Sequence, residues 1–184
     1  MEITIETLYA AQKGDIEAQH RLMHVLYAPV YHFIQKRVGN RDIGDELCQT
    51  VFLKCYEHLA QYRRQDGSVG TWIFRIARNT LIDYYRKKRS EPVDDLREIP
   101  ATDTISDTSA YASNRIDSAY VAKLLTRLDS EEADVVTLRS IKEMPYDEIA
   151  RIIDKSEEAT RKIHSRALMR LRVFIEEDNK TSTL

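Results

Sequence analysis

Hydrophobic residues recur at intervals of three and four along most of this chain, which is the spacing of one buried helix face. In the first 89 residues the pattern predicts three or four helices, and three of them can be placed, at residues 15–38, 42–60 and 71–88. Asp15 follows a glycine and suits the cap of the first of these helices. A polar loop at residues 62–70 separates the second from the third.

The last third of the chain returns to the same periodicity. One amphipathic stretch covers residues 116–128, and a helix follows Ser130, a residue type that suits the N-cap before two glutamates. Pro145 then opens a short helix at residues 146–153. A turn of residues 154–156, ending on Ser156 as a cap, leads into a final helix at residues 157–172.

Between these helical parts the composition changes. Residues 90–117 show no periodic apolar pattern, hold two of the four prolines, and are rich in Ser and Thr. From residue 91 to residue 107 there are six acids and one base, a net charge of −5, which is typical of a linker. The sequence therefore predicts an all-α protein of two small helical domains joined by a flexible acidic linker: residues 1–89, linker 90–117, residues 118–178, and a tail at 179–184.

Composition excludes several classes of protein. Five glycines in 184 residues are too few for the frequent turns of sandwiches and barrels. No stretch approaches the roughly 20 apolar residues of a membrane span, and the first ten residues lack the basic-then-apolar order of a secretion signal. Two cysteines seven positions apart on one helix would lie about 10 Å apart, too far for a disulfide. We therefore expect a cytoplasmic protein with no membrane insertion.

The charges nearly cancel, with 28 Lys and Arg against 30 Asp and Glu and a net charge of −2. A protein that binds nucleic acid firmly by itself needs a positive surface. The distribution is uneven, however, because residues 86–89 are four consecutive bases and residues 157–172 carry two acids against five bases. The overall charge therefore excludes only an autonomous, strongly basic DNA-binding protein.

The short helix, tight turn and longer helix between residues 146 and 172 have the layout of a DNA-reading helix-turn-helix. Ala150 is small where the two helices would cross. Arg161, Lys162 and Ser165 lie off the apolar stripe, where they could reach base edges or phosphates. The alternative is an ordinary solvated helix face, but the turn and the clustered bases together favour DNA.

The helix predicted at residues 71–88 carries a polar stripe with spacings of four, four and three: Arg75, Asn79, Asp83 and Arg86. Such a face, running into the basic residues 86–89, suits contact with a nucleic-acid backbone. Alternatively, Asp83 serves only to pair with Asn79 and Arg86. Trp72, Tyr84 and Tyr85 offer rings for stacking unpaired bases, although Trp72 begins the apolar stripe and is predicted to pack in the core.

No arrangement of side chains predicts catalysis. Asp45 and Glu46 are adjacent on a helix, so their carboxylates point about 100° apart and cannot share a substrate. Beside the apolar Leu47 and Phe52 they indicate a surface for protein contact. We therefore expect a protein that is not an enzyme.

A metal site is also weakly supported. Cys48, Cys55 and His58 fall near one stripe, and His20 and His24 are four residues apart. A structural zinc site needs four convergent ligands, whereas these cysteines alternate with apolar residues, where buried thiols are common. The sequence therefore predicts core cysteines, no metal and no cofactor.

Three stretches, taken together and in this order, resemble bacterial sigma factors. DELCQTVFLK at residues 45–54 is similar to their acidic helix, and GTWIFRIARNTLIDYYR at residues 70–86 is similar to their tryptophan-containing segment. MPYDEIA at 144–150 with RALMRLR at 166–172 resembles their C-terminal helix-turn-helix. Order, spacing and length match the extracytoplasmic-function (ECF) group of the sigma-70 family, and the resemblance covers nearly the whole chain outside the linker.

The resemblance implies an RNA polymerase sigma factor that directs promoter-specific initiation. Its implied contacts with the clamp helices of the polymerase β′ subunit are Asp45, Glu46, Leu47, Gln49 and Phe52. The implied contacts with the −10 element are Arg63, Arg64, Arg75, Asn79, Arg86 and Lys87. Those with the −35 element are Arg161, Lys162, Ser165 and Arg166. The β flap of the polymerase and promoter DNA are further implied partners, and members of the group often have an anti-sigma factor as well.

The chain departs from the family pattern at six positions: Ile43, Thr50, Asp154, Lys155, Glu158 and Ile163. The first two shift the implied polymerase contact, and the last four alter the −35 face, so no promoter sequence is predicted. Asp154 stands where glycine is usual, and Asp tolerates a left-handed conformation better than most residues. The rival interpretation is a free-standing helix-turn-helix regulator, which would bind a duplex operator without polymerase.

Overall fold

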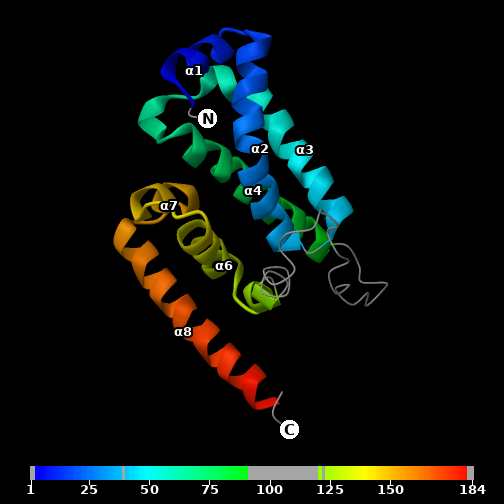
Figure 1. The fold of residues 1–184 in the computed structure, drawn as a ribbon, viewed down its shortest axis with the longest axis vertical. Coiled ribbons are helices and arrows are strands. Elements are labelled where there is room, and N and C mark those ends of the chain that lie inside the picture. Colours follow the sequence, from blue (N-terminus) through cyan, green and yellow to red (C-terminus); the bar gives the residue numbers. More distant parts are fainter. Residues whose placement is uncertain (1–2, 39, 91–119, 122, 182–184) are drawn as a thin grey trace, which may run out of the picture. The chain divides into compact units, whose positions relative to one another are not determined.

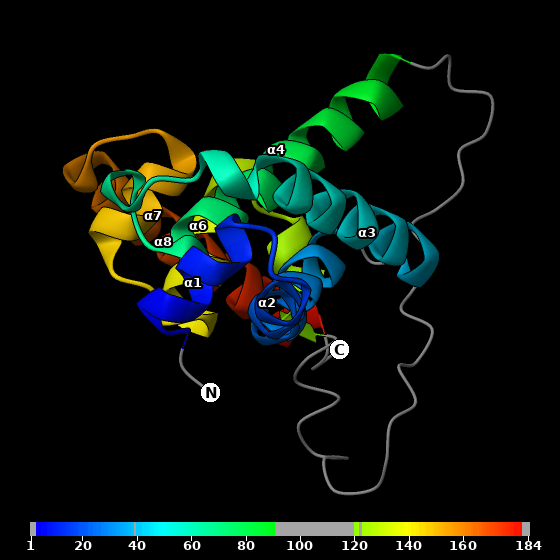
Figure 2. The same ribbon diagram turned by 90° about the horizontal axis from the view of Figure 1, so that it is seen from above.

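The computed structural model describes residues 3–38, 40–90, 120–121 and 123–181, and the regular elements within these ranges are all helical. The chain divides into two compact units, residues 1–96 and residues 97–184, whose helices are drawn from two directions in Figure 1 and Figure 2. The predicted all-α, two-domain fold is thereby confirmed. Residues 91–117 of the predicted linker lie outside the described residues.

The first unit is built from four helices: α1 (Ile5–Gln12), α2 (Ile16–Val38), α3 (Arg41–His58) and α4 (Val69–Ser90). Two 3-10 turns, η1 (Leu59–Gln61) and η2 (Arg64–Asp66), lie between α3 and α4. The three helices placed from the sequence are confirmed to within about two residues at each end, the usual uncertainty of helix boundaries. The fourth, α1, is the short one that periodicity left unplaced.

Side-chain caps explain where these helices begin. The Oδ1 of Asp15 accepts from the Ala18 amide at 2.8 Å, as the sequence predicts for α2. Asn40 caps α3 in the same way, accepting from the Ile43 amide at 3.0 Å. Each cap satisfies an amide of the first helical turn that has no partner within the helix.

The core of the first unit forms around α2, which packs against α1, α3 and α4. Its inward face follows the predicted period, with five side chains fully buried: Ala18, Leu22, Val30, Phe33 and Ile34. The ring of Phe33 meets that of Phe74 on α4 edge to face, with the centroids 5.4 Å apart. Such aromatic pairs add stability beyond the apolar area that they bury, so α4 is held firmly against α2.

The two cysteines on α3 are part of this core, as predicted. Cys48 and Cys55 are buried and not bonded to each other. Burial raises the pKa of Cys48 to about 11 and that of Cys55 to about 12. Both thiols therefore stay protonated at neutral pH and pack as small apolar groups.

In the second unit, residues 120–121 and 123–126 are helical and precede α6 (Ser130–Val136), which runs into the π-helical turn η3 (Thr137–Ile141). The cap of α6 is Asp129, and the prediction of Ser130 is wrong: Asp129 has an extended backbone, and its Oδ1 accepts from the Glu132 amide at 2.9 Å. Ser130 is instead the first residue of the helix.

The helix-turn-helix consists of α7 (Tyr146–Ile153) and α8 (Glu157–Thr181). Asp154 adopts the left-handed conformation, with φ 58° and ψ 52°, and so takes the place of the usual glycine. The Lys155 amide closes the turn by donating to the Ala150 carbonyl at 3.0 Å. Ser156 then caps α8, accepting from the Ala159 amide at 3.1 Å. Both the predicted turn and the predicted cap are confirmed.

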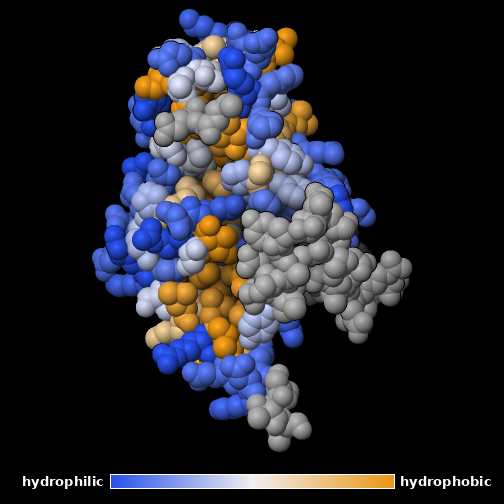
Figure 3. Space-filling view, in the orientation of Figure 1, coloured by the Kyte–Doolittle hydropathy of each residue, from blue (hydrophilic) through white to orange (hydrophobic). Residues whose placement is uncertain are grey.

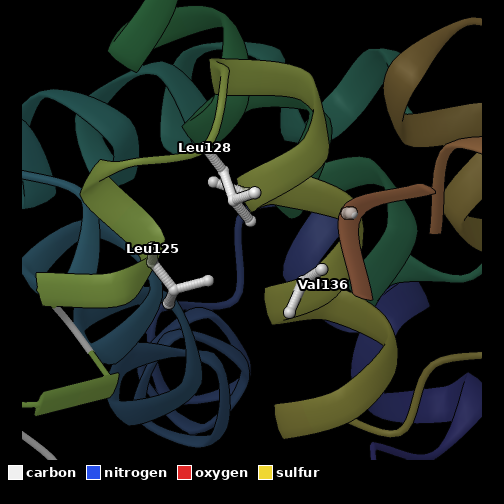
Figure 4. Packing of buried hydrophobic residues seen from close by; sticks show 5 residues of the cluster. Leu125, Leu128 and Val136 are labelled. Carbon is white, nitrogen blue, oxygen red and sulfur yellow. The ribbon is translucent and has the colours of Figure 1, made fainter. Parts of the chain in front are cut away.

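The core of the second unit joins α8 to the segment before it. Buried side chains converge in one cluster: Leu125, Leu128, Ala133, Val136 and Ala167. Figure 4 shows Leu125, Leu128 and Val136 pointing into this shared space. Because α6 and α7 both pack against α8, the cluster fixes the helix that carries the predicted DNA face.

The described helices include none that is both long and apolar enough to cross a membrane. Figure 3 shows hydrophilic side chains over most of the visible face, with apolar side chains in patches between them. The candidate binding surfaces predicted from the sequence lie on the polar faces of α3, α4 and α8.

Candidate nucleic-acid interface

The acidic face of α3 is only partly as the sequence suggested. Glu46 and Gln49 are exposed and Asp45 is half-exposed, so these three side chains can meet a partner. Leu47 and Phe52, each 8% exposed, lie inside the unit and hold the helix in place. Of the five residues predicted to contact the polymerase, the three polar ones are thus accessible to a partner, and the two apolar ones are buried in the core of the unit.

Two tyrosines that sequence reasoning missed lie beside this acidic face. Tyr27 on α2 stacks on Tyr31 at 5.7 Å and on Phe52 at 5.5 Å between ring centroids. Burial raises the pKa of Tyr31, and a hydrogen bond with the Asp45 carboxylate raises it further. The i, i+4 spacing of Tyr27 and Tyr31 is a signal that could have found them. Together they extend the acidic face with aromatic surface.

The polar stripe on α4 is continuous because the helix runs unbroken from Val69 to Ser90. Arg75 is half-buried, and Asn79, Arg86 and Lys87 are exposed. Arg86 pairs with Asp83 at 2.9 Å, so this part of the alternative interpretation is confirmed. The pair is exposed and weak, which leaves the arginine able to turn to another partner.

The aromatic residues of α4 are engaged within the first unit. Trp72 packs at a tilt on the buried Tyr62, with centroids 5.3 Å apart, but it is only half-buried, so the predicted core position is only partly reached. The Tyr85 hydroxyl donates to the Arg37 carbonyl on α2, and Tyr84 meets the Tyr85 ring edge to face at 5.1 Å. Tyr84 and Tyr85 keep part of their surface exposed.

The loop before α4 is closed upon itself. Tyr62 is buried, and its hydroxyl donates to the Gly67 carbonyl at 2.8 Å, across a turn in which Gly67 has the positive φ of 114° that favours glycine. Arg63 and Arg64 are exposed on this loop. Arg63 donates to the Ala60 carbonyl at 3.2 Å. Internal hydrogen bonds therefore hold the loop in one conformation, with two arginines exposed on its surface.

All four residues predicted to contact the −35 element are exposed on α8. Arg161 and Lys162 form ion pairs one turn back along the helix, with Glu157 and Glu158, each at 2.6 Å. Ser165 lies on the same exposed part of the helix. Two glutamates on the same face thus partly neutralise its basic charge.

The fourth residue, Arg166, has a structural partner that the sequence did not reveal. Its Nε donates at 3.2 Å to Glu132, which is only 1% exposed and also accepts from Arg170. A buried carboxylate requires such partners. The contact spans 34 residues of sequence, so no local pattern signals it. Arg166 therefore joins α8 to α6 while keeping much of its side chain exposed.

Histidines and cysteines do not converge. The described residues contain no group of three or more His, Cys, Asp or Glu able to hold a metal ion. His20 and His24 line a surface pocket together with Arg21, Met23 and Tyr56, whereas both cysteines are buried in the core.

Comparison with known protein families gives two matches. The Sigma-70 region 2 family model matches residues 22–91, and the Sigma-70 region 4 model matches residues 124–173. The first match contains α3 and α4, and the second contains α7, the turn and the first part of α8, to residue 173. Together the two matches cover more than half of the chain, in the order that the three sequence stretches follow.

Curated relatives agree with these matches. The ECF RNA polymerase sigma factor BldN of Streptomyces coelicolor is 25% identical over 95% of this chain and 66% of its own length. SigM of Bacillus subtilis, another ECF sigma factor, is 29% identical over 79% of this chain and 87% of its own. The ECF sigma-E factor of Escherichia coli is 28% identical over 78% of each.

Two solved structures share the fold. CnrH, solved in complex with the cytosolic domain of CnrY, superposes with a TM-score of 0.74 at 21% identity, covering 96% of this chain and 99% of that one. RpoE of Bartonella quintana, solved with the anti-sigma factor NepR, gives 0.70 at 18% identity, covering 85% and 96%. At these identities the likeness shows the fold alone.

Proposed function

The chain belongs to the ECF group of the sigma-70 family of RNA polymerase sigma factors, with a region 2 and a region 4 domain, and we propose the following division of its contacts between the two domains. Members of this family are initiation factors and not enzymes. The observation that carries the proposal is the ordered match of both regions, one on each compact unit.

The acidic face of α3 is the proposed docking surface for core polymerase. Asp45, Glu46 and Gln49 would contact the β′ clamp helices. Leu47 and Phe52 support them from inside the unit. Support for this role comes from the exposure of the three polar side chains and from the aromatic surface of Tyr27 and Tyr31 beside them.

The polar stripe of α4 and the loop before it are the proposed contacts of the −10 element. The contacting residues would be Arg63, Arg64, Arg75, Asn79, Arg86 and Lys87. Two features support this: the unbroken helix keeps the stripe on one face, and the closed loop presents Arg63 and Arg64 at its surface. Cations of this kind fix the register of a protein on a phosphate backbone.

The start of α8 is the proposed reader of the −35 element, through Arg161, Lys162, Ser165 and Arg166. The confirmed helix-turn-helix supports this, because its second helix is the one that enters a major groove. The second domain would also contact the β flap of the polymerase. The i, i+4 ion pairs on α8 are exposed and weak, so phosphates could displace them.

We also propose an anti-sigma partner and a cytoplasmic location without membrane insertion. CnrH and RpoE, which share the fold, are each solved with another protein bound, and for RpoE that protein is an anti-sigma factor. The location follows from the proposed work on polymerase.

The test is transcription in vitro with purified core RNA polymerase, the full chain and a library of promoter fragments. The expected result is that the chain binds core polymerase and yields transcripts from a defined subset of fragments. Tight binding of duplex DNA without polymerase, while core polymerase stays inert, would identify a free-standing regulator and overturn the proposal.

A further inference from the structure

Tyr146, in the first turn of α7, lies where three elements of the second unit meet. Arg139 from η3 and Arg161 from α8 both lie over its ring, with the guanidinium carbons 4.6 Å and 4.3 Å from the ring centroid. A guanidinium within about 6 Å of an aromatic centroid is attracted by the ring face. The ring is therefore a platform for Arg161, one of the residues proposed to contact DNA.

The platform is itself held in place by His164 on α8. The Tyr146 hydroxyl lies 2.8 Å from Nδ1 of His164, and Nε2 of the same ring lies 3.1 Å from the Ser140 hydroxyl. A neutral imidazole has one donor and one acceptor. All three groups are satisfied when the phenol donates to Nδ1 and Nε2–H donates to Ser140. The position of the Tyr146 ring is thus fixed from two other elements.

Arg161 is also held by a carboxylate. Its Nε and Nη2 both donate to Oε1 of Glu157, at 3.1 Å and 2.6 Å. The side chain nevertheless remains 58% exposed, and the five N–H donors of a guanidinium are not exhausted by these two bonds. The ring therefore orients the group, and the exposed pair with Glu157 leaves an edge available for an outside acceptor.

We propose that Tyr146, fixed by His164, is a positioning residue that holds the Arg161 guanidinium in place for contact with promoter DNA. The inference rests on the proposed −35 role of α8. A long side chain that is ordered before binding loses less rotamer freedom when the contact forms. Arg161 then reads DNA more tightly than an unsupported arginine would, and the ring contributes without having to touch DNA.

The test is a double-mutant cycle in the holoenzyme formed from core polymerase and the full chain. Wild-type holoenzyme first selects duplexes from a library randomised upstream of a fixed −10 region, and one selected duplex serves as the probe. Its affinity is then measured for Arg161→Ala, Tyr146→Leu and the double variant. A matched control is Arg172→Ala, which removes another exposed arginine from the same helix, one that pairs with a glutamate four residues after it instead of four before.

Arg161→Ala is expected to weaken binding roughly tenfold, as loss of a good base or phosphate contact does. Tyr146→Leu is expected to weaken it about threefold, the size of an exposed cation–π contact. The double variant should bind no more weakly than Arg161→Ala alone, because the ring acts only through that arginine. Arg172→Ala should bind like wild type.

Losses that multiply in the double variant, or unchanged binding by Tyr146→Leu, would overturn the inference. If Tyr146→Leu does not fold by circular dichroism, the cycle is run with Tyr146→Phe. That variant keeps the ring but frees it from His164, and about a twofold loss that disappears in the Arg161→Ala background is then expected. If wild-type holoenzyme selects no upstream sequence, it is the −35 proposal itself that fails.

Discussion

The described contacts that join distant segments differ between the two units. In the first, distant segments are joined through hydrogen bonds to backbone carbonyls, such as those from Gln12 to Leu59 and Tyr62 and from Tyr85 to Arg37. In the second, they are joined by ion pairs. Arg166 and Arg170 reach the buried Glu132, and Arg127 pairs with Glu177 at 2.7 Å and with Asp178 at 2.9 Å.

Because of this difference, the residues proposed to bind a partner contribute little to stability in the first unit, whereas in the second unit one of them also stabilises the fold. The acids on α3 lie at the surface, and the ion pair that Asp45 forms with Arg41 is long, at 4.0 Å, and exposed. Arg166 on α8 has two tasks, since it holds Glu132 and belongs to the proposed DNA face. A change of surface charge should therefore affect mainly partner binding in the first unit, and both binding and folding in the second.

The largest effect is expected from reversing charge on α3. Asp45→Lys together with Glu46→Lys should abolish binding to core polymerase, a loss of about 100-fold or more, because like charges now oppose each other across the contact. The stability of the first unit should fall by about 1–2 kcal/mol, since an exposed ion pair with Arg41 and the hydrogen bond between Tyr31 and Asp45 are lost. Gel filtration with core polymerase measures the binding.

The matched control is Glu17→Lys with Glu57→Lys, two exposed acids of the same unit at a distance from this face along α2 and α3. Its binding should equal that of wild type. Equal binding by the Asp45 and Glu46 variant as well would remove the docking proposal.

The largest effect on stability, as distinct from binding, is expected in the second unit. Arg166→Ala with Arg170→Ala leaves the Glu132 carboxylate buried without these two partners, and such a change costs about 3–5 kcal/mol. Hydrogen exchange of the α6 and α8 amides measures the opening free energy of this unit separately. Arg172→Ala, which breaks an exposed pair between Arg172 (84% exposed) and Glu176 (59% exposed), should cost less than about 0.5 kcal/mol.

A third substitution separates the buried charge from simple loss of contacts. Adding Glu132→Met to the Arg166 and Arg170 variant should restore much of the stability, because an apolar side chain of similar volume needs no partner. If the two-arginine variant is as stable as Arg172→Ala, the ion pairs do not hold this unit together and the comparison between the units fails.

The elements of both units could be predicted because they depend on local sequence. Apolar spacing placed α2, α3 and α4, and the cap at Ser156 and the left-handed Asp154 marked the turn of the helix-turn-helix. The choice of Ser130 over Asp129 failed because two good capping residues are adjacent, and only the backbone conformation decides which one caps.

The site was less predictable because its contacts join residues far apart in sequence. Spacing placed Arg161 off the apolar stripe, but it did not show that Tyr146 would lie against it. The resemblance named Arg166 as a DNA contact without indicating its pair with Glu132. Leu47 and Phe52 were assigned to a contact surface and lie inside the unit, since a motif names positions without saying which face is buried. The packing of the helices against one another determines these long-range contacts and which face is buried.

A smaller effect is expected when a neutral hydrogen bond of the first unit is removed. Tyr62→Phe loses the bond to the Gly67 carbonyl while keeping the ring against Trp72. The expected cost is about 1 kcal/mol, the net value of one such bond. Hydrogen exchange of α4 amides measures it, at low and at high salt. The loss of stability should be the same at low and at high salt, because no charge is involved. A strongly salt-dependent loss would contradict the difference between the two units.

The smallest effect is a pH dependence confined to the second unit. Burial, and then the charge of Arg139, hold the pKa of His164 below its ordinary value of about 6.5. The imidazole ring of His164 faces Tyr146 from α7 and Ser140 and Arg139 from η3. Arg161, on the same helix as His164, lies over the Tyr146 ring. Because the unfolded chain takes up the proton more readily, the neutral ring stabilises the fold fully above pH ~6.5, and that stability is lost as the pH falls through the lower folded value.

Hydrogen exchange of the α8 amides at two pH values, one on each side of 6.5, measures this loss against His164→Gln, which cannot titrate. We expect less than about 0.5 kcal/mol between the two proteins, since solvent screens a partly exposed ring. The α2 amides of the first unit should show no difference between wild type and variant at either pH. Equal loss of protection in α2 and α8, or the same pH dependence in His164→Gln as in wild type, would show that His164 is not the titrating group. The hydrogen bond between neutral His164 and Tyr146 would then make no measurable contribution to stability.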